Sequence, residues 1–518
     1  MKILFINPLD KANCVNFVVQ PLGLMYISSF LRKHSSHEIK ILDMKVNLMS
    51  EKDALKEIER FSPDVVGIRA LSVEVATVHC LAEMTKKDHP YRKVIVGGPY
   101  TNGSSDNILK DPNVDFVVIG EGEETVCELM VEIEKGNNAP ETHGIGYRRN
   151  GKTVFTPPRM LIQDLDSIPF PAWDLIDVES YFKVPSWNFH ISKHMAVFTS
   201  RGCPFKCAYC HNIFGKKPRM RSPENVLKEI EILYNQYGVR ELKIIDDIFN
   251  VRRSRVHRIC DLIIEKGFNV DICFPNGLRG DIMDKATLQK LKAAGTFEIT
   301  YAVETASPRL QKLIKKNVNL PKLKQVIEET ERLGIFTRGF FMMGFPSETK
   351  EEIHATAKYS LSSKLHWMSM FVVNPFEGTE IADIAKEMDI KIDYNKMDFS
   401  GGYRVNDVQL SEMPVQEIKA LQFKTLGKFF LNPIRLYSIY RCSHDKKQKL
   451  LFVFTIILKA ILPASKRDKW IRGLFIVIYN LNKCYDSIKS KIFYNKTCEK
   501  GNVTIDNRQL IQELKMKK

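Results

Sequence analysis

The stretch that decides the fold is RGCPFKCAYCHNIFGKK, at residues 201–217. It carries Cys203, Cys207 and Cys210 in the spacing C-x3-C-x2-C, directly after the apolar run MAVFTS. A disulfide would use two of these cysteines and leave one over. The other cysteines are scattered singly and form no secreted disulfide framework, and the start MKILFINPLD lacks the cleavage site of a signal peptide. The spacing therefore favours a metal site.

Two kinds of metal site remain open. Structural zinc takes four ligands, and His211 is the nearest candidate for the fourth. However, His211 directly follows Cys210, and adjacent residues rarely reach one tetrahedral ion. Cubane iron–sulfur clusters are held by thiolates, and three thiolates would leave one iron free to bind a substrate-like molecule. The sequence favours the cluster and keeps zinc as the alternative.

Strand-like and helical segments alternate six times between Met195 and about Val373. The strand-like runs are MAVFTS, ELKIIDD, VDICFPN, FEITYAVE, FTRGFFMMGF and HWMSMFVVNP. Several of the helical segments between them open with Ser, Asp or Pro and close with Gly, as helix caps require. Six such units predict a partial (β/α)6 barrel, whose active site would gather at the carboxyl ends of its strands. The cysteine loop follows the first strand and so belongs to that end.

Polar residues follow the other predicted barrel strands. Asp246 and Asp247 end the second strand, Arg279 follows the third, Glu304 ends the fourth and Gly344 lies at the end of the fifth. A carboxylate that closes an apolar strand costs free energy unless it has partners. We therefore expect Glu304 to bind something, with a salt bridge to a neighbouring cation as the structural alternative.

Residues 1–140 alternate in the same way. The runs KILFINPL, HEIKILDM, DVVGIRAL, KVIVGGPY and DFVVIGEG predict buried parallel strands of a doubly wound, Rossmann-like sheet. Such sheets bind ligands at the carboxyl ends of their strands. Gly97, Gly98, Gly120 and Glu121 lie there, where glycine lets a backbone approach a ligand closely. The alternative is that these glycines only make tight turns.

Taken together, the ordered motifs resemble the radical S-adenosylmethionine (SAM) superfamily, and PLGLMYISSFLRK, VIVGGPY and DFVVIGEGEETV resemble the cobalamin-binding domain of many of its members. The resemblance implies a [4Fe-4S] cluster on the three cysteines, with SAM on the fourth iron, and cobalamin on the N-terminal domain. The cofactor-binding candidates are Tyr209, Asp247, Arg279, Glu304 and Gly344 in the barrel and Gly97, Gly98, Gly120 and Glu121 in the N-terminal domain.

One segment departs from other cobalamin-binding domains. Those domains carry an Asp-x-His-x-x-Gly segment whose histidine ligates cobalt from below, whereas the corresponding loop here, DKANCVNFVVQ, has no histidine. Many radical SAM members of this group lack it too. The resemblance therefore implies cobalamin without a protein histidine ligand, and a domain that binds no cobalamin is the alternative.

The function implied by the resemblance is reductive cleavage of SAM to a 5′-deoxyadenosyl radical for cobalamin-dependent methylation of an unactivated carbon. A flavodoxin- or ferredoxin-like electron donor is implied as well. The alternatives are a radical cyclase or rearrangement enzyme of the anaerobic magnesium-protoporphyrin cyclase type, and a non-catalytic iron–sulfur or cobalamin-binding protein. The sequence does not identify the substrate, which we expect to be a small or lipid-like molecule.

The charge is concentrated at the C-terminus. The 518 residues carry a net charge of +16, but residues 421–518 alone hold 21 Lys and Arg against 6 Asp and Glu. The catalytic body is therefore near neutral, and we expect no nucleic-acid partner. The tail also has two apolar runs, Leu450–Leu462 and Gly473–Leu481, that are too short to span a bilayer. Basic residues and Trp470 border them, which suits a helix lying in a membrane interface; a hairpin packed on the barrel is the alternative.

We therefore expect four parts. These are a cobalamin-binding Rossmann-like domain at 1–140, a Pro- and Asp-rich linker at 141–190, the radical SAM partial barrel at 191–400, and a basic, apolar helical region at 401–518. The expected location is the cytoplasm, with peripheral contact to the inner face of the cell membrane through the tail.

Overall fold

A computed structural model describes residues 1–9, 18–183, 192–210, 213–392 and 408–443. The chain divides into two units, Met1–Leu451 and Phe452–Lys518, and the described residues all belong to the first. The histidine-free loop, His211 and both apolar runs of the tail lie wholly or largely outside the described residues, so the expectations about them stay predictions. Within the described part of the chain, no helix is long and apolar enough to cross a membrane.

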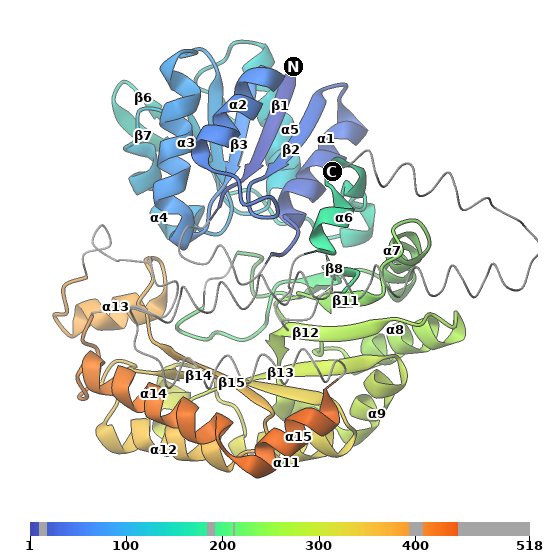
Figure 1. The fold of residues 1–518 in the computed structure, drawn as a ribbon. Helices are drawn as coiled ribbons and strands as arrows, with labels where there is room; N and C mark the ends of the chain where they lie inside the picture. The colour runs from blue at the N-terminus through green and yellow to red at the C-terminus, as the bar shows by residue number, and fades with distance from the viewer. Residues whose placement is uncertain (10–17, 184–191, 211–212, 393–407, 444–518) are drawn as a thin grey trace, which may run out of the picture. The chain divides into compact units, whose positions relative to one another are not determined.

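The N-terminal domain contains one sheet of seven strands (Figure 1). The strands follow the order β2 (Glu38–Asp43), β1 (Lys2–Asn7), β3 (Val65–Arg69), β4 (Lys93–Gly97), β5 (Phe116–Val118), β6 (Ile145–Arg149) and β7 (Lys152–Phe155). The first five are parallel. Because the strand order reverses at β1, the chain winds in both directions from that strand. Helix α1 (Leu22–His34) packs with α5 (Gly122–Glu134), and helix α2 (Glu51–Phe61) packs with α3 (Val75–Lys87). The predicted doubly wound fold is confirmed.

The structure differs from the expected linker at its start. Residues 145–155 form β6 and β7, which extend the sheet as an antiparallel hairpin. The turn holds Asn150 at φ 51° and Gly151 at φ 75°, and an Asn-Gly pair favours this left-handed hairpin turn. The N-terminal sheet therefore continues beyond residue 140 to Phe155.

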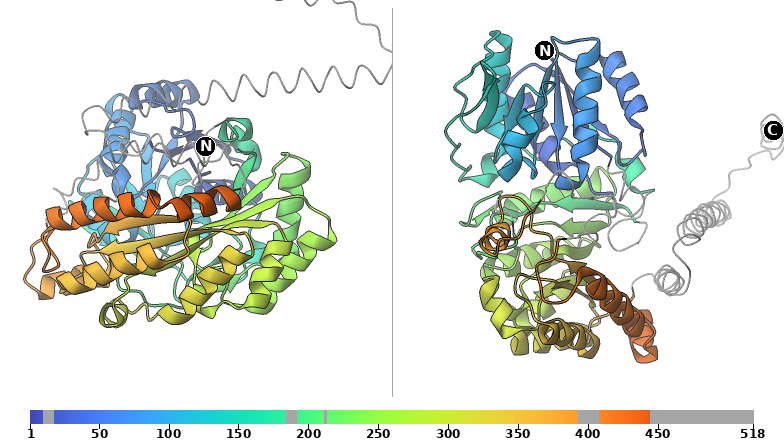
Figure 2. Two further views of the ribbon diagram at one scale, coloured as in Figure 1. Left: turned by 60° about the horizontal axis from the view of Figure 1, so that its bottom comes forward. Right: turned by 90° about the vertical axis from the view of Figure 1, so that its left-hand side faces the viewer.

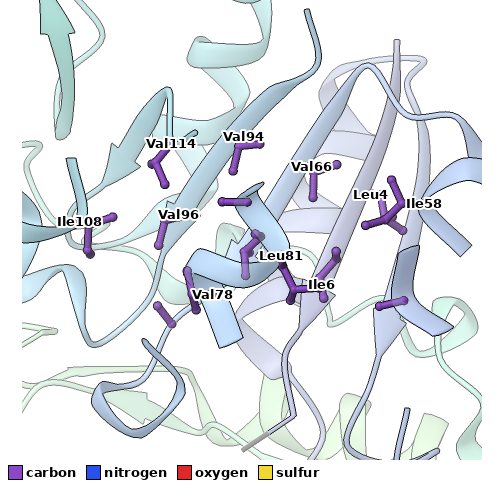
Figure 3. Close-up of a cluster of buried hydrophobic side chains, with 14 of the residues drawn as sticks. Leu4, Ile6, Ile58, Val66, Val78, Leu81, Val94, Val96, Ile108 and Val114 are labelled. Atoms are coloured by element: carbon purple, nitrogen blue, oxygen red, sulfur yellow. The ribbon is translucent and has the colours of Figure 1, made fainter. Parts of the chain in front are cut away.

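Branched aliphatic side chains fill the space between this sheet and its helices (Figure 3). Leu4, Ile6, Val66 and Val94 from the strands meet Leu81 and other helix residues, all essentially inaccessible to solvent. Parallel strands covered on both faces need such continuous apolar runs. Burial of the runs explains why the strands could be recognised in the sequence.

The second sheet has six parallel strands. Their order is β15 (Trp367–Val372), β14 (Phe336–Met343), β13 (Thr296–Glu304), β12 (Asp271–Leu278), β11 (Glu241–Ile244) and β8 (His194–Val197). Helices α7 (Pro223–Asn235), α8 (Arg253–Glu265), α9 (Lys285–Ala293), α11 (Leu320–Arg332) and α12 (Lys350–Ser362) alternate with them. Each strand pairs with the next along the chain, so the sheet curls into the predicted partial barrel.

Capping side chains fix where the barrel helices begin. Ser222 accepts the Asn225 N–H at the start of α7, and Asp284 accepts the Thr287 N–H at the start of α9. Such caps satisfy backbone donors that have no partner inside the helix. At α7 and α9 the expected cap residues therefore mark the helix start, whereas α8 begins after Arg252 without a side-chain cap.

Helices also cover the outer strand of the barrel. After α13 (Glu380–Glu387), helix α14 (Val415–Phe430) packs on β15, and helix α15 (Pro433–Cys442) packs on α14 (Figure 2). Gln422 donates to the Met370 carbonyl of β15, and Arg435 donates to the Leu361 and Ser363 carbonyls at 2.9 and 3.1 Å. Covering an edge strand in this way prevents unwanted pairing with other chains. The described part of the predicted C-terminal region is thus helical.

Candidate functional site

The cysteine loop lies at the carboxyl end of the first barrel strand. Two short strands close it at its base, because β9 (Ser200–Arg201) pairs with β10 (Arg219–Met220). Gly202 has a φ of 85°, and a Cβ there would lie 2.8 Å from the Lys217 carbonyl oxygen. Ala208 links the loop to its neighbours by donating to the Ile314 carbonyl at 2.9 Å and accepting from the Ile381 N–H at 3.0 Å. The loop is therefore held in place by the barrel.

The three cysteines form no disulfide, and ionisation of one affects the others. Cys203 and Cys207 are half-buried, and Cys210 is more exposed. The pKa of Cys203 is raised, and that of Cys210 is raised to about 11; loss of hydration is the main cause in both, and the negative charge of Cys207 contributes. Metals bind the thiolate form. A cationic group among the three sulfurs would supply the missing positive charge, so this donor set fits an iron–sulfur cluster.

The spacing of the sulfurs argues against a mononuclear zinc site. Among the described residues, the group of three donors that lie within 4.8 Å of one another is Glu331, His366 and Cys442, and the cysteine loop does not form such a group. A zinc ion with bonds of about 2.3 Å needs sulfurs closer together than that. The expected cubane, which spreads its ligands over several irons, is the better fit.

The group of Glu331, His366 and Cys442 itself is a structural contact. His366 Nδ1 accepts the Thr337 N–H at 2.9 Å, so Nε2 carries the proton and donates to Ser438 Oγ at 3.1 Å. Glu331 is paired with Arg441 of α15. These contacts fasten α15 to the barrel and leave His366 no lone pair for a metal.

Glu304 ends β13 in a left-handed conformation, at φ 64°, and is buried. Its Oε1 accepts from Tyr209 Oη and from Lys316 Nζ, both at 3.0 Å, and Lys316 Nζ lies 3.0 Å from Tyr209 Oη as well. Burial and the Glu304 charge hold the pKa of Tyr209 well above its usual value. The salt bridge weighed as an alternative is therefore present, and it ties β13 to the cysteine loop.

Lys316 was not singled out from the sequence. It stands between Lys315 and Asn317, which both have a φ of 52°. These two left-handed positions, one on each side of Lys316, turn the chain so that the Lys316 side chain enters the protein. The pair of lysines in IKKN was the available signal, but it did not indicate which of the two is buried.

Asp246 and Asp247 have different surroundings. Asp246 is buried and accepts from the Thr199 N–H at 2.6 Å and from Ser200 Oγ at 2.6 Å. Asp247 is exposed and accepts the Gly202 N–H at 2.9 Å. Desolvation, followed by the charge of Asp246, raises the pKa of Asp247, and this side chain interacts with Cys203 and Cys210. Asp247 therefore faces the site, while Asp246 supports it.

Two further candidate residues, Arg279 and Gly344, already form contacts with other groups of the protein. The Arg279 guanidinium binds Asp281 at 2.9 and 3.2 Å and lies 3.8 Å above the Phe205 ring of the cysteine loop. The N–H of Gly344 donates to Glu348 at 2.6 Å. Burial raises the pKa of Glu348 to about 7. Arg279 and Gly344 therefore lie at the barrel mouth but are engaged in shaping it.

The three candidate glycines of the N-terminal domain differ in how much space surrounds them. Gly98 has a φ of 108°, and a Cβ there would lie 3.0 Å from the Ala70 carbonyl oxygen, so a tight turn explains it. Gly120 has a φ of 82°, and no atom of a described residue other than its chain neighbours lies within 4 Å of a Cβ placed there. Gly97 has ordinary contacts only, with a Cβ 3.7 Å from Val118. Of the three, Gly120 has the open space that a ligand would need.

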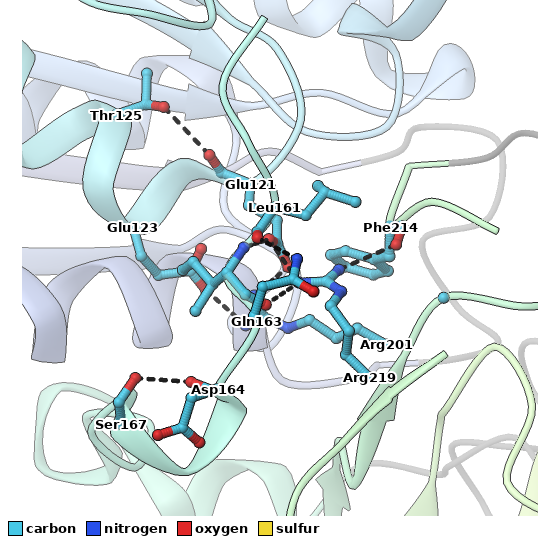
Figure 4. A network of polar contacts seen from close by, with 12 residues as sticks. Glu121, Glu123, Thr125, Leu161, Gln163, Asp164, Ser167, Arg201, Phe214 and Arg219 are labelled. Carbon is cyan, nitrogen blue, oxygen red and sulfur yellow. Dashed lines mark hydrogen bonds and ion pairs between the residues drawn. The ribbon is translucent and has the colours of Figure 1, made fainter. Parts of the chain in front are cut away.

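Glu121 belongs to a closed polar network (Figure 4). Its carboxylate accepts from Arg201 at 2.9 Å, from Arg219 at 2.8 and 2.9 Å, and from the Ile162 N–H at 2.8 Å. Burial alone would raise the pKa of Glu121, but the hydrogen bonds from Arg219 and Arg201 hold it below its usual value. These contacts explain Glu121 without a cofactor. Arg201 and Arg219, which flank the cysteine loop, were not singled out from the sequence.

A second contact joins the same ends of the two sheets. Ser104 Oγ, in α4 (Thr101–Leu109), donates to Glu377 Oε2 at 2.7 Å, and Asn107 donates to it at 3.2 Å. Glu377 lies in the loop after β15, while Arg201 and Arg219 flank the loop after β8. The carboxyl ends of β4 and β5 therefore face the carboxyl ends of the barrel strands. These are the edges at which each kind of fold binds ligands.

Comparison with known proteins agrees with this arrangement. The B12 binding domain model matches residues 10–130, and the Radical SAM superfamily model matches residues 197–360. An uncharacterized methyltransferase of Pyrococcus horikoshii is 30% identical over 439 residues, which cover 84% of this chain and 93% of that protein. The anaerobic magnesium-protoporphyrin IX monomethyl ester cyclase of Rubrivivax gelatinosus is 24% identical, over 89% of this chain and 83% of the cyclase.

A solved structure shares the fold. It is the radical S-adenosylmethionine methyltransferase TsrM of Kitasatospora setae, with cobalamin and a [4Fe-4S] cluster bound. The TM-score is 0.67 at 15% identity, with 89% of this chain and 99% of that chain covered. At that identity the likeness concerns the fold alone.

Proposed function

We propose that this chain cleaves SAM reductively at a [4Fe-4S] cluster and methylates an unactivated carbon with the help of cobalamin. The proposal starts from the family, because the chain belongs to the radical SAM enzymes that carry a B12-binding domain. The cluster, SAM and cobalamin would supply the radical and the methyl group. The protein would bind these groups, orient them and exclude water.

The observation that carries this proposal is that the two ligand-binding edges face each other. The contacts of Glu121 with Arg219 and of Ser104 with Glu377 bring these edges together. A cobalamin on the N-terminal sheet and a SAM on the barrel would then share one enclosed space. Two separate binding modules would have no need for that arrangement.

The residue roles follow from the contacts. Cys203, Cys207 and Cys210 would hold the cluster, and Asp247 would lie beside it. Glu304 would bind SAM, because its Oε2 accepts no hydrogen bond from the described residues while Oε1 is held by Tyr209 and Lys316. Gly120 would let cobalamin approach the backbone. Tyr209, Arg279 and Gly344 would position these groups.

The test is replacement of all three loop cysteines by Ala, with a matched control in which Cys80, Cys127 and Cys442 are replaced instead. After anaerobic reconstitution, we expect the control to hold four irons per chain and to form 5′-deoxyadenosine from SAM with dithionite. The loop variant should do neither. Unchanged iron content in the loop variant would overturn the cluster assignment.

A second candidate function uses the same site. The likeness to the cyclase of Rubrivivax gelatinosus favours radical cyclisation or rearrangement without methyl transfer. Reconstitution with hydroxocobalamin followed by desalting separates the two, because methylation as proposed requires retained cobalamin. Loss of all cobalamin would favour the cyclase alternative, and loss of SAM cleavage as well would leave a non-catalytic binding protein.

The partners belong to the same proposal. A flavodoxin- or ferredoxin-like protein would supply the electron, and the substrate would be a small or lipid-like molecule. We also propose a cytoplasmic protein that contacts the inner face of the cell membrane through its tail, which concentrates basic and apolar residues. Flotation with anionic vesicles at low salt tests this contact, and a protein that stays at the bottom of the gradient contradicts it.

A further inference from the structure

We propose that Lys206, Lys217 and Lys312 form a docking surface for an acidic one-electron carrier protein. All three side chains are exposed. The inference rests on the proposed function, since a carrier is needed only where a cluster must be reduced. It concerns a surface of this chain that the site described above does not use.

The three lysines come from segments that are tied to the cysteine loop. Lys206 lies inside the loop, directly before Cys207. Lys217 belongs to the turn that packs against Gly202, where the Gly215 carbonyl accepts the Cys203 N–H at 3.2 Å. Lys312 is two residues from Ile314, whose carbonyl accepts the Ala208 N–H at 2.9 Å. A protein that contacts these lysines would therefore lie against the cysteine loop and the two segments that are hydrogen-bonded to it.

Two segments of the chain that include these lysines carry only positive charge. Residues 201–222 and residues 308–324 each contain six Lys and Arg and no Asp or Glu. Most of these cations already have partners. Lys216 donates to the Phe205 carbonyl. The others with partners pair with carboxylates: Arg201 and Arg219 with Glu121, Arg221 with Glu229, Arg309 with Glu352, Lys315 with Glu380 and Lys316 with Glu304.

Five lysines of the two segments lie outside that set: Lys206, Lys217, Lys312, Lys322 and Lys324. Their side chains form no ion pair or hydrogen bond with any described residue, and the first three lie in or beside the parts of these segments that contact the cysteine loop. Two acidic side chains at the start of α13, Glu380 and Asp383, are paired with Lys315 and Lys386. Positive charge without a partner at the surface attracts an acidic protein and speeds its association.

The accessibility of the loop supports the same partner. Cys210 is exposed in the structure, so a protein docked on the loop can approach one of the proposed cluster ligands. The transfer itself is a single-electron step in which the reduced carrier loses one electron and the cluster gains it. No bond is made or broken and no proton moves, so the carrier needs only proximity and correct orientation, which surface charge provides.

The experiment compares two triple variants of the full chain. The surface variant carries Lys206→Glu, Lys217→Glu and Lys312→Glu. The matched control carries Lys52→Glu, Lys87→Glu and Lys228→Glu, which are also exposed lysines without an ion pair among the described residues. Both variants change the net charge equally, so any difference between them reports the location of the charge.

Two readouts are taken with a strongly acidic flavodoxin as the probe. We expect the surface variant to bind the flavodoxin at least about 10-fold more weakly than the control at low salt, and to lose flavodoxin-driven SAM cleavage to the same degree. The difference should shrink as salt rises, because exposed charges are screened over about 10 Å at 0.1 M. With dithionite, which is a small anion and needs no docking surface, both variants should cleave SAM like the unchanged protein.

The outcomes separate this inference from the proposed function. Equal flavodoxin binding by the two variants would overturn the docking surface, whatever the activity. Failure of all proteins to cleave SAM with dithionite would overturn the proposed function, while the binding comparison would still decide whether the surface exists. Loss of the dithionite reaction in the surface variant alone would show damage to the loop and would contradict a role confined to docking.

Discussion

Glu121, after β5, and Glu304, at the end of β13, are both buried carboxylates at the ligand-binding end of a strand, but they differ in how many hydrogen bonds they accept. Glu121 accepts four, two on each oxygen, from Arg201, Arg219 and the Ile162 N–H. Glu304 accepts two, both on Oε1. A carboxylate has room for about four. Position at a strand end therefore does not identify a binding residue; the unused accepting capacity does.

Glu348 is a third case. Its Oε2 accepts the N–H groups of Gly344 and Phe345 at 2.6 and 2.9 Å, while Oε1 has no hydrogen-bond partner among the described residues. It has no close cation comparable to those of Glu121, and burial raises its pKa to about 7. The three carboxylates thus range from saturated to partly open, and the predictions below test this order.

The largest effect is expected for Glu121→Ala. This change leaves Arg201 and Arg219 buried without their shared partner, and breaking a buried ion pair costs about 3–5 kcal/mol of unfolding free energy. Urea denaturation measures the loss. The control is Glu38→Ala, an exposed position that should change stability by less than about 0.5 kcal/mol. A Glu121→Ala protein as stable as this control would contradict the view that the network is structural.

The next effect concerns pH and Glu348. Because its folded pKa is raised above the unfolded value, its contribution to stability is full below about pH 4.5 and is lost as pH rises through about 7. This loss amounts to about 3 kcal/mol. Stability of the unchanged protein should therefore fall between pH 5 and 8 relative to Glu348→Gln, which cannot ionise. Parallel pH profiles for the two proteins, measured by urea denaturation, would refute the shifted pKa.

A smaller change is expected from Glu304→Gln, and it should appear in SAM binding. A hydrogen bond to a charged group is worth about 1.5–3 kcal/mol, so the affinity for SAM should fall about 10-fold or more. Equilibrium dialysis with labelled SAM measures this on reconstituted protein. The same dialysis on Glu352→Gln, a carboxylate held by Arg309 outside the proposed site, should show unchanged affinity. Equal affinities of both variants would remove Glu304 from the proposed site.

The smallest effects separate two glycines. Gly98→Ala should lower the unfolding free energy by more than about 1 kcal/mol, because the backbone is left-handed and the new Cβ meets the Ala70 carbonyl. Gly120→Ala meets no atom and carries the backbone cost alone. Its proposed effect is on cobalamin retention after desalting. Retention that falls with Gly98→Ala but not with Gly120→Ala would reverse the assignment of the two positions.

Much of this architecture could be predicted from local pattern. The apolar runs, the caps such as Ser222 and Asp284, and the spacing of Cys203, Cys207 and Cys210 are properties of neighbouring residues, and the structure confirms the elements that they predict. The hairpin of β6 and β7 was readable in the same way from Asn150-Gly151, although its membership in the N-terminal sheet was not.

By itself, the sequence determined the alternation of strands and helices, the two sheet architectures and the loop that carries the thiols, because periodicity and capping act over a few residues. Only the tertiary structure decided which polar side chains are engaged. Glu121 meets Arg219 across 98 positions of the chain, and Tyr209 meets Glu304 across 95. Whether a buried carboxylate retains a free oxygen depends on such long-range partners, and no local pattern specifies them.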